Sequence, residues 1–118
     1  MEKSFIEITR RISANLKPLR KDLPEAMQAF SALAQNAMRP GALDKKTKEL
    51  IALALGVAGH CDPCIGFHVE ALINLSATRL EIEEALGVAV YMGGGPSLMY
   101  AAEALAACDE FLAQKNAA

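Results

Sequence analysis

Apolar residues recur along the chain at intervals of three and four positions, which is the spacing of one face of an α-helix. Residues 4–16 show this pattern, and Pro18 is expected to end the helix. The stripe there consists of Phe5, Ile8, Ile12 and Leu16. Polar and glycine-rich breaks divide the rest of the chain into similar segments, so we predict an all-α bundle of about six helices. The helices are expected at residues 4–16, 24–38, 44–57, 61–75, 78–92 and 97–114.

Capping signals support three of these helix starts. Pro24 is favourable in the first turn of a helix, where its missing N–H would be unpaired in any case. Asp44 is a suitable N-cap for the third helix. Thr78 and Glu81 form a capping-box pattern, in which each side chain can satisfy the backbone amide at the other position.

Two stretches are unusually apolar. Residues 50–59 contain no polar side chain, so the third helix is expected to be central and buried. Residues 85–102 contain no charge, but Gly93-Gly94-Gly95-Pro96 interrupts them. A pair of buried helices separated by a simple break therefore fits this stretch better than a membrane span.

The composition agrees with a helical protein. The chain has 118 residues, which fits a single domain over residues 1–118. Hydrophobic residues make up 53% of it, too many for a disordered chain. Aromatic residues make up only 5%, whereas Ala and Leu, which favour helices, are abundant. Because a small domain buries a limited part of its surface, this apolar content predicts self-association.

The charge balance excludes some partners. The chain contains 12 Lys and Arg residues and 14 Asp and Glu residues, which gives a formal net charge of −2. Without a surplus of positive charge, we expect neither nucleic acid nor a membrane surface as a partner. The first residues form no apolar signal-peptide core, so we expect a cytoplasmic protein.

The segment Cys61-Asp62-Pro63-Cys64, followed four residues later by His68, carries the clearest chemical signal. On a helix, residues three apart share a face about 5–6 Å apart, which suits a disulfide. His68 lies one turn further on the same face, where its imidazole can take a proton from a thiol. Free amides at a helix start stabilise a thiolate, and a reducing compartment favours a disulfide that cycles. Residue 65 is Ile rather than His, which excludes the c-type haem signature.

Glu49 is a candidate third member of this site. It stands at the start of the apolar third helix. If the third and fourth helices form an antiparallel hairpin around Gly59 and His60, Glu49 lies within a turn of His68. Glu49 would then orient and charge His68, which would deprotonate Cys64.

The cysteine pair also allows two other interpretations. Two free thiols can be inert and buried, because Cys often behaves as a small hydrophobic residue. Together with His68 and either His60 or Glu49, the pair supplies enough ligands for zinc in a non-enzymatic binding or redox-sensing module. Structural zinc pairs usually lie in turns with a second pair well separated, which this spacing does not offer.

Single residues have plainer interpretations as well. By itself, His68 would be a core histidine bonded to a backbone carbonyl. Glu49 would be a solvated carboxylate near Lys45, in a common and weak pair. Cys108 lies in an alanine-rich run and is expected to serve packing.

The four candidate residues have a distinctive spacing. Eleven residues separate Glu49 from Cys61, two separate Cys61 from Cys64, and three separate Cys64 from His68. This arrangement resembles the core motif of the alkylhydroperoxidase D-like proteins, which belong to the carboxymuconolactone decarboxylase-like superfamily. The strong resemblance covers residues 44–75, and the rest agrees in length and helical content only. The resemblance implies an all-helical fold that assembles into a homotrimer or homohexamer. It also implies peroxide reduction by a dithiol that cycles through a disulfide, and we expect no cofactor and no resident metal.

The resemblance also implies roles for the four residues. The cysteine matching Cys64 attacks the peroxide, and the one matching Cys61 resolves the sulfenic acid. The residues matching Glu49 and His68 form a proton relay. Reducing power comes from a dihydrolipoyl or thioredoxin-like donor. The alternative within redox chemistry is a disulfide reductase or adaptor with little peroxidase activity.

The sequence departs from some members of that family between the two cysteines. Those members carry an additional His there, whereas this chain has Asp62-Pro63, and His60 stands just outside the pair. The fine tuning of the thiol pKa is therefore expected to differ from theirs. The cysteine pair itself argues against lactone decarboxylation, since the decarboxylating members generally lack it.

Overall fold

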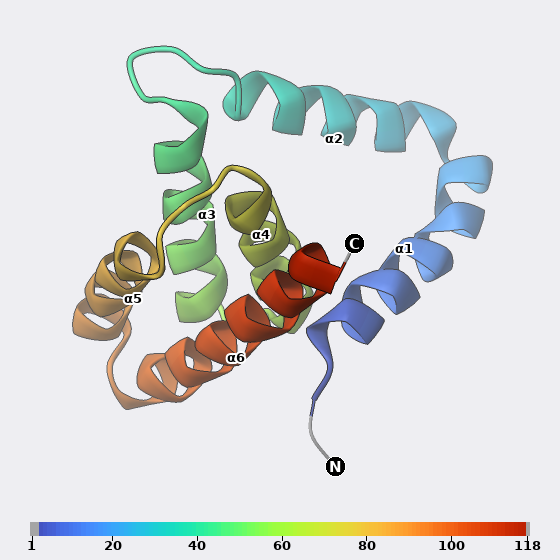
Figure 1. The fold of residues 1–118 in the computed structure, drawn as a ribbon. Helices are drawn as coiled ribbons and strands as arrows, with labels where there is room; N and C mark the ends of the chain where they lie inside the picture. Colours follow the sequence, from blue (N-terminus) through green and yellow to red (C-terminus); the bar gives the residue numbers. More distant parts are fainter. Residues whose placement is uncertain (1–2, 118) are drawn as a thin grey trace.

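The computed structural model describes residues 3–117, which form six helices and no strand (Figure 1). The helices are α1 (Phe5–Asp22), α2 (Pro24–Ala37), α3 (Lys45–Ala58), α4 (Asp62–Asn74), α5 (Arg79–Gly93) and α6 (Gly95–Ala117). The prediction of an all-α fold is confirmed. The predicted helix bounds agree with the observed ones to within a few residues, except at the end of α1.

Local caps explain where several helices begin. The Asp44 side chain accepts a hydrogen bond from the backbone N–H of Thr47, at 2.7 Å, and caps α3. At the start of α5 both hydrogen bonds of the predicted capping box between Thr78 and Glu81 are present. Pro24 stands at the first position of α2, as expected.

The prediction that Pro18 ends the first helix is wrong, because α1 continues to Asp22 with Pro18 inside it. Proline has no N–H to donate to the carbonyl four residues earlier, which is that of Ala14. Ala14 and Pro18 are both exposed, so water can satisfy that carbonyl. Good helix formers after the proline, such as Leu19 and Arg20, extend the helix by another turn.

The glycine run separates α5 from α6, as predicted. Gly94 follows α5 with φ of +78°, a backbone conformation that side-chain-bearing residues rarely adopt, and α6 begins at Gly95. Within residues 3–117, the structure contains no helix with both the length and the apolar character needed to cross a membrane.

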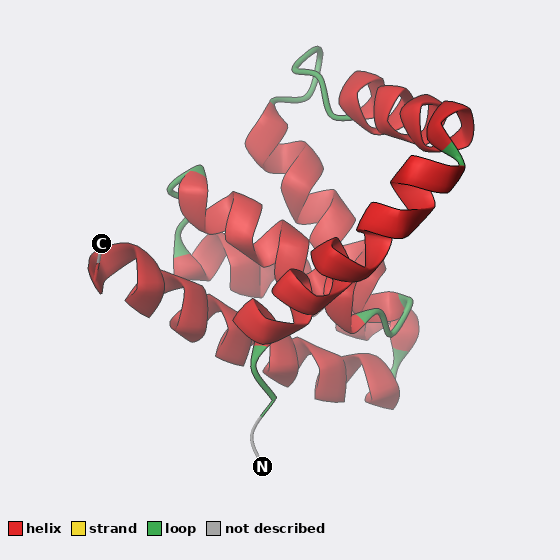
Figure 2. Ribbon diagram, turned by 90° about the vertical axis from the view of Figure 1, so that its right-hand side faces the viewer, coloured by secondary structure: helices red, strands yellow, loops and turns green. Residues whose placement is uncertain are grey.

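Helix α3 lies at the centre of the packed body, in contact with α4, α5 and α6. Figure 2 shows that loops alone connect the helices, with no strand among the described residues. The core that these helices share includes the fully buried side chains of Leu53, Val57, Ile65, Val69 and Leu72. The prediction that residues 50–59 are buried all round is wrong on one face. Ile51 and Leu55 are 46% and 68% exposed.

Helix α2 packs differently from the other helices. Among the described residues it packs against α1 alone, apart from a hydrogen bond from Lys48 Nζ of α3 to the Ala37 carbonyl at 3.0 Å, and it buries none of its side chains. Figure 1 shows it standing apart from α3–α6, between the end of α1 and the loop that returns to α3. Phe30 and Leu33 are therefore 68% and 64% exposed. The functional groups must be sought in the packed body, where α3 and α4 lie side by side.

Candidate functional site

The α3–α4 hairpin brings Glu49 and His68 together. Glu49 Oε1 lies 2.6 Å from His68 Nδ1, although the two residues are nineteen positions apart in sequence. The side chain of Glu49 is 8% exposed and that of His68 is 32% exposed. This contact is the one expected from an antiparallel hairpin around Gly59 and His60.

The Glu49–His68 contact determines which ring nitrogen is available for chemistry. A carboxylate can only accept a hydrogen bond, so the proton in this contact belongs to Nδ1 of His68. Nε2 is then the nitrogen that can take up or release a proton. Since Glu49 is buried, it holds the imidazole from the core side, while the more exposed ring remains accessible.

Cys61 and Cys64 form a disulfide, with their Cα atoms 5.2 Å apart. Cys61 is the N-cap of α4, and its sulfur accepts a hydrogen bond from the backbone N–H of Cys64 at 3.2 Å. In the reduced protein, the same N–H and the positive end of the helix dipole would stabilise a thiolate on Cys61. His68 lies four residues after Cys64 on α4, one turn further along the helix.

Gly56 is a residue of this site that the sequence patterns did not reveal. A Cβ atom on Gly56 would lie 3.1 Å from the Cβ of Cys64, so a larger residue there would push α3 and the start of α4 apart by a few tenths of an ångström. The backbone N–H of Cys61 also donates a hydrogen bond to the Gly56 carbonyl, at 3.0 Å. A lone glycine inside an apolar helix was the available signal for such a close approach.

Lys3 and Tyr100, from opposite ends of the chain, also lie beside the cysteine pair, and no sequence motif marked either of them. Lys3 Nζ forms an ion pair with Asp62 Oδ2 at 3.0 Å. Its hydrogen bond with Asp62 raises the pKa of Lys3 above the ordinary lysine value. The ring of Tyr100 stacks on that of His60, with the centroids 4.7 Å apart. His60 adopts a positive φ of 56° in the turn before Cys61, a conformation uncommon for a residue with a side chain.

Cys108 lies outside the disulfide and is buried in α6. Burial raises the pKa of its thiol to about 11, so it stays protonated near neutral pH. These properties fit the packing role expected for it. Among residues 3–117, no group of three or more His, Cys, Asp and Glu side chains is placed to hold a metal ion.

Comparison with known proteins identifies the family. The sequence model of the carboxymuconolactone decarboxylase family matches residues 24–107, which include the whole hairpin and the cysteine pair. The chain belongs to the carboxymuconolactone decarboxylase family. An uncharacterized protein of Cupriavidus necator is 42% identical over 103 residues, or 87% of this chain and 88% of that protein. A protein from the cox locus of Paracoccus denitrificans is 43% identical over 82 residues, 70% of this chain and 74% of that protein.

Solved structures of carboxymuconolactone decarboxylase family proteins show the same fold. One, from Legionella pneumophila in its apo form, is 62% identical and superposes with a TM-score of 0.90 over 92% of this chain and 96% of its own. Another, from Thermotoga maritima, is 29% identical with a TM-score of 0.78 over 97% and 94% of the two chains. The Thermotoga protein is described as having a possible part in an antioxidative response. The resemblance seen in the sequence motif is thus confirmed at the level of family and fold.

Proposed function

We propose that this carboxymuconolactone decarboxylase family member is a thiol-dependent peroxidase that reduces alkyl hydroperoxides. One observation carries the proposal. A disulfide-forming cysteine pair occupies the first turn of α4, and a histidine one turn further is held by a buried carboxylate at 2.6 Å. These are a nucleophile, a base and a group that orients the base. The description of the Thermotoga relative points to the same chemistry.

The oxidative half of the cycle uses both cysteines. His68 takes the thiol proton of Cys64, and the resulting thiolate attacks the distal oxygen of the hydroperoxide. The O–O bond breaks, Cys64 becomes a sulfenic acid, and the leaving alkoxide takes the proton back from His68 to form an alcohol. The Cys61 thiol then attacks the Cys64 sulfur, which gives the disulfide and one water molecule.

The reductive half restores the dithiol. An external dithiol, of the dihydrolipoyl or thioredoxin-like kind, exchanges with the disulfide and leaves as a disulfide itself. The complete cycle thus consumes one hydroperoxide and one dithiol and yields an alcohol, water and the oxidised donor. Such a cycle belongs in a reducing compartment such as the cytoplasm, where dithiol donors are kept reduced.

Peroxide-dependent sulfenic acid identifies the attacking cysteine and tests the peroxidase proposal. We expect Cys61→Ser to accumulate a sulfenic acid on Cys64 with alkyl hydroperoxide, because no resolving thiol remains. We expect Cys64→Ser to form none at a comparable rate. A probe of sulfenic acid with peptide mass spectrometry, in a Cys108→Ala background, distinguishes the sites. Trapping only in Cys64→Ser would reverse the two roles, and trapping in neither variant would refute the peroxidase.

A second candidate function is disulfide reduction with little peroxidase activity. It is favoured by the N-cap position of Cys61, whose sulfur already accepts the Cys64 N–H at 3.2 Å. A thiolate stabilised at that position attacks disulfides well. Turnover of an alkyl hydroperoxide is therefore to be compared with turnover of a disulfide substrate, using the same dithiol donor. Faster peroxide turnover supports the peroxidase, and the opposite order supports the reductase.

We also propose that the chain assembles into a homotrimer or homohexamer. The exposed apolar side chains of α2 and α5 support this, among them Phe30, Leu33, Val88 and Met92. An isolated fourteen-residue helix is marginal in water, so α2 gains stability when another chain covers it. Light scattering with size-exclusion chromatography measures the mass. A mass equal to that of one chain at high concentration would refute assembly.

A further inference from the structure

A salt bridge connects the first residues of the chain to the segment between the two cysteines. Lys3 Nζ lies 3.0 Å from Asp62 Oδ2 and 3.9 Å from Glu103 Oε1, and its ammonium is 6.0 Å from the centre of the Tyr100 ring. Asp62 is the first residue of α4 and directly follows Cys61. The position between the cysteines therefore carries a carboxylate whose nearest cation comes from nearly sixty residues away in sequence.

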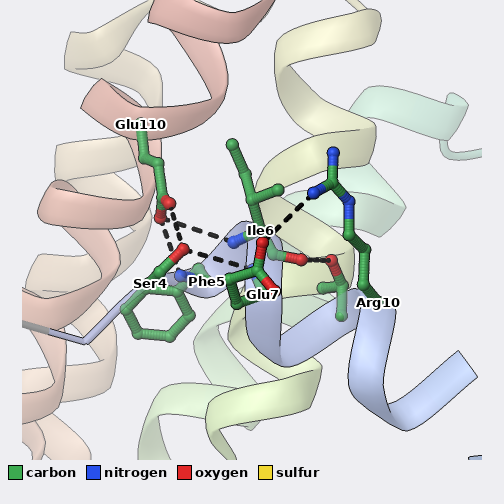
Figure 3. A network of polar contacts seen from close by, with 7 residues as sticks. Ser4, Phe5, Ile6, Glu7, Arg10 and Glu110 are labelled. Atoms are coloured by element: carbon green, nitrogen blue, oxygen red, sulfur yellow. Dashed lines mark hydrogen bonds and ion pairs between the residues drawn. The ribbon is translucent and has the colours of Figure 1, made fainter.

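The N-terminal segment is anchored independently of this salt bridge. The Glu110 carboxylate, from α6, accepts hydrogen bonds from the Ser4 hydroxyl and from the backbone N–H of Phe5, the latter at 2.7 Å (Figure 3). It thereby pairs free amides at the start of α1. The side chain of Phe5, which directly follows Ser4, is fully buried and holds the segment against the core. Lys3, two residues before Phe5, is thus presented to Asp62 by a structured segment.

A carboxylate beside a thiolate has a definite electrostatic effect. A like charge nearby disfavours the thiolate, whereas a cation nearby favours it. One oxygen of Asp62, Oδ1, is buried without a hydrogen-bond partner among the described residues, so part of its charge is poorly solvated. The charged and titratable side chains around this turn are Lys3 from the N-terminal segment, Glu49 from α3, His60 from the turn, Asp62 and His68 from α4, and Tyr100 and Glu103 from α6.

We propose that Lys3 is a positioning residue for the dithiol. Its ammonium offsets the negative charge of the Asp62 carboxylate, which would otherwise disfavour a thiolate on the neighbouring sulfurs. In this inference, which rests on the proposed function, the Asp62 carboxylate stands between the two cysteines in sequence and the Lys3 ammonium is brought to it by the N-terminal segment. The two side chains are 40% and 29% exposed, so water screens the effect. We expect a change of about half a pH unit in the apparent pKa of the more acidic thiol, or about threefold in thiolate.

A pair of substitutions tests this inference on the reduced protein without any peroxide. In a Cys108→Ala background, we expect Lys3→Met to raise the apparent pKa of the more acidic thiol and to slow its alkylation about threefold below that pKa. Adding Asp62→Asn to Lys3→Met should bring both values back to near those of the parent, because the uncompensated carboxylate is then gone. Ultraviolet thiolate absorbance against pH gives the pKa. Iodoacetamide labelling with peptide mass spectrometry assigns it to Cys61 or Cys64.

Control variants separate electrostatics from a loss of structure. Lys3→Arg keeps the charge and should preserve the parent pKa, and Lys17→Met removes another exposed lysine from the N-terminal part of the chain and should change nothing. An unchanged pKa in Lys3→Met overturns the inference. So does a raised pKa that Asp62→Asn does not restore, since Lys3 would then act only by holding the segment in place.

The outcome is independent of whether the protein turns over peroxide. If the coupling between Lys3 and Asp62 is present but hydroperoxide is not reduced, the peroxidase proposal fails and the electrostatic inference stands for the reductase alternative. If peroxide is reduced but the coupling is absent, the peroxidase stands and Lys3 has no part in it.

Discussion

Helices α2 and α3 are both fourteen residues long, yet one buries no side chain and the other lies at the centre of the fold. Helix α3 packs against three other helices, whereas α2 packs only against α1 among the described residues. Both are rich in alanine and carry apolar residues at helical spacing. The comparison shows that such a pattern predicts a helix but does not determine what covers its apolar face.

The difference between these two helices also explains where chemistry can take place. Glu49 and Gly56 of α3 are held by packing on all sides, so they place His68 and Cys64 with little freedom. A catalytic arrangement requires such rigid support. The exposed side chains of α2, Phe30 above all, instead offer surface to another molecule.

The strongest way to test this comparison is the same substitution in the body and in α2. Leu72 of α4 is fully buried, whereas Leu33 of α2 is 64% exposed. We expect Leu72→Ala to lower the free energy of unfolding by about 2–5 kcal/mol, through lost burial and the cavity it leaves. In the dissociated chain, Leu33→Ala should change it by less than about 0.5 kcal/mol. Urea unfolding followed by circular dichroism measures both.

Repeating these measurements over a range of protein concentrations tests the proposed assembly. If another copy covers α2, the cost of Leu33→Ala increases with concentration while that of Leu72→Ala does not. Equal costs for the two variants at every dilution would contradict the distinction between body and α2.

A second prediction concerns the contact between α3 and α4. Glu49→Gln keeps the shape of the side chain but removes the negative charge that orients His68. We expect kcat/KM for an alkyl hydroperoxide to fall about 100-fold, equivalent to about 2.7 kcal/mol, within the range for a disrupted general base. The matched control is Glu70→Gln, which removes a carboxylate from α4 that has no part in the contact and should retain the parent rate.

Peroxidase kinetics over a range of pH, together with thermal unfolding, separate the possible causes. A loss of rate without a large loss of Tm supports a relay. A full rate in Glu49→Gln would mean that the buried carboxylate serves the fold only.

Much of the fold follows from local signals that the structure confirms. The Asp44 cap, the Thr78 capping box and the glycine break after α5 depend on side chains within a few residues of the helix ends. The Glu49–His68 contact could be predicted too, because a hairpin with a short turn leaves few ways to pair its two helices. Pro18 was misjudged because its cost depends on solvent exposure, which the motif does not show.

Other parts of the site depend on contacts between distant segments. Nothing near Lys3 in the sequence indicates that it meets Asp62, and Tyr100 reaches His60 only because α6 crosses the α3–α4 turn. The sequence also did not predict that Phe30 is exposed, because its position in the helical pattern is that of a core residue. These contacts can be identified only from the tertiary structure. Helical periodicity shows which face of a helix is apolar, but not which segment packs against that face.

The smallest effect we predict concerns an ion pair at the N-terminal end of α3. Lys46 Nζ bonds Glu81 Oε2 at 2.7 Å and links α3 to α5. This bond raises the pKa of Lys46 above its ordinary 10.5 and, with the Thr78 backbone bond, lowers that of Glu81 below its ordinary 4.5. The stabilisation is therefore complete between these ordinary values. It is lost as pH falls through the lowered pKa of Glu81 or rises through the raised pKa of Lys46.

We expect Lys46→Met to reduce Tm slightly at neutral pH and not in strong acid, while Lys45→Met, the exposed neighbour, reduces it at neither. A deficit of equal size at both pH values would mean that Lys46 contributes by packing its aliphatic chain and not by its charge.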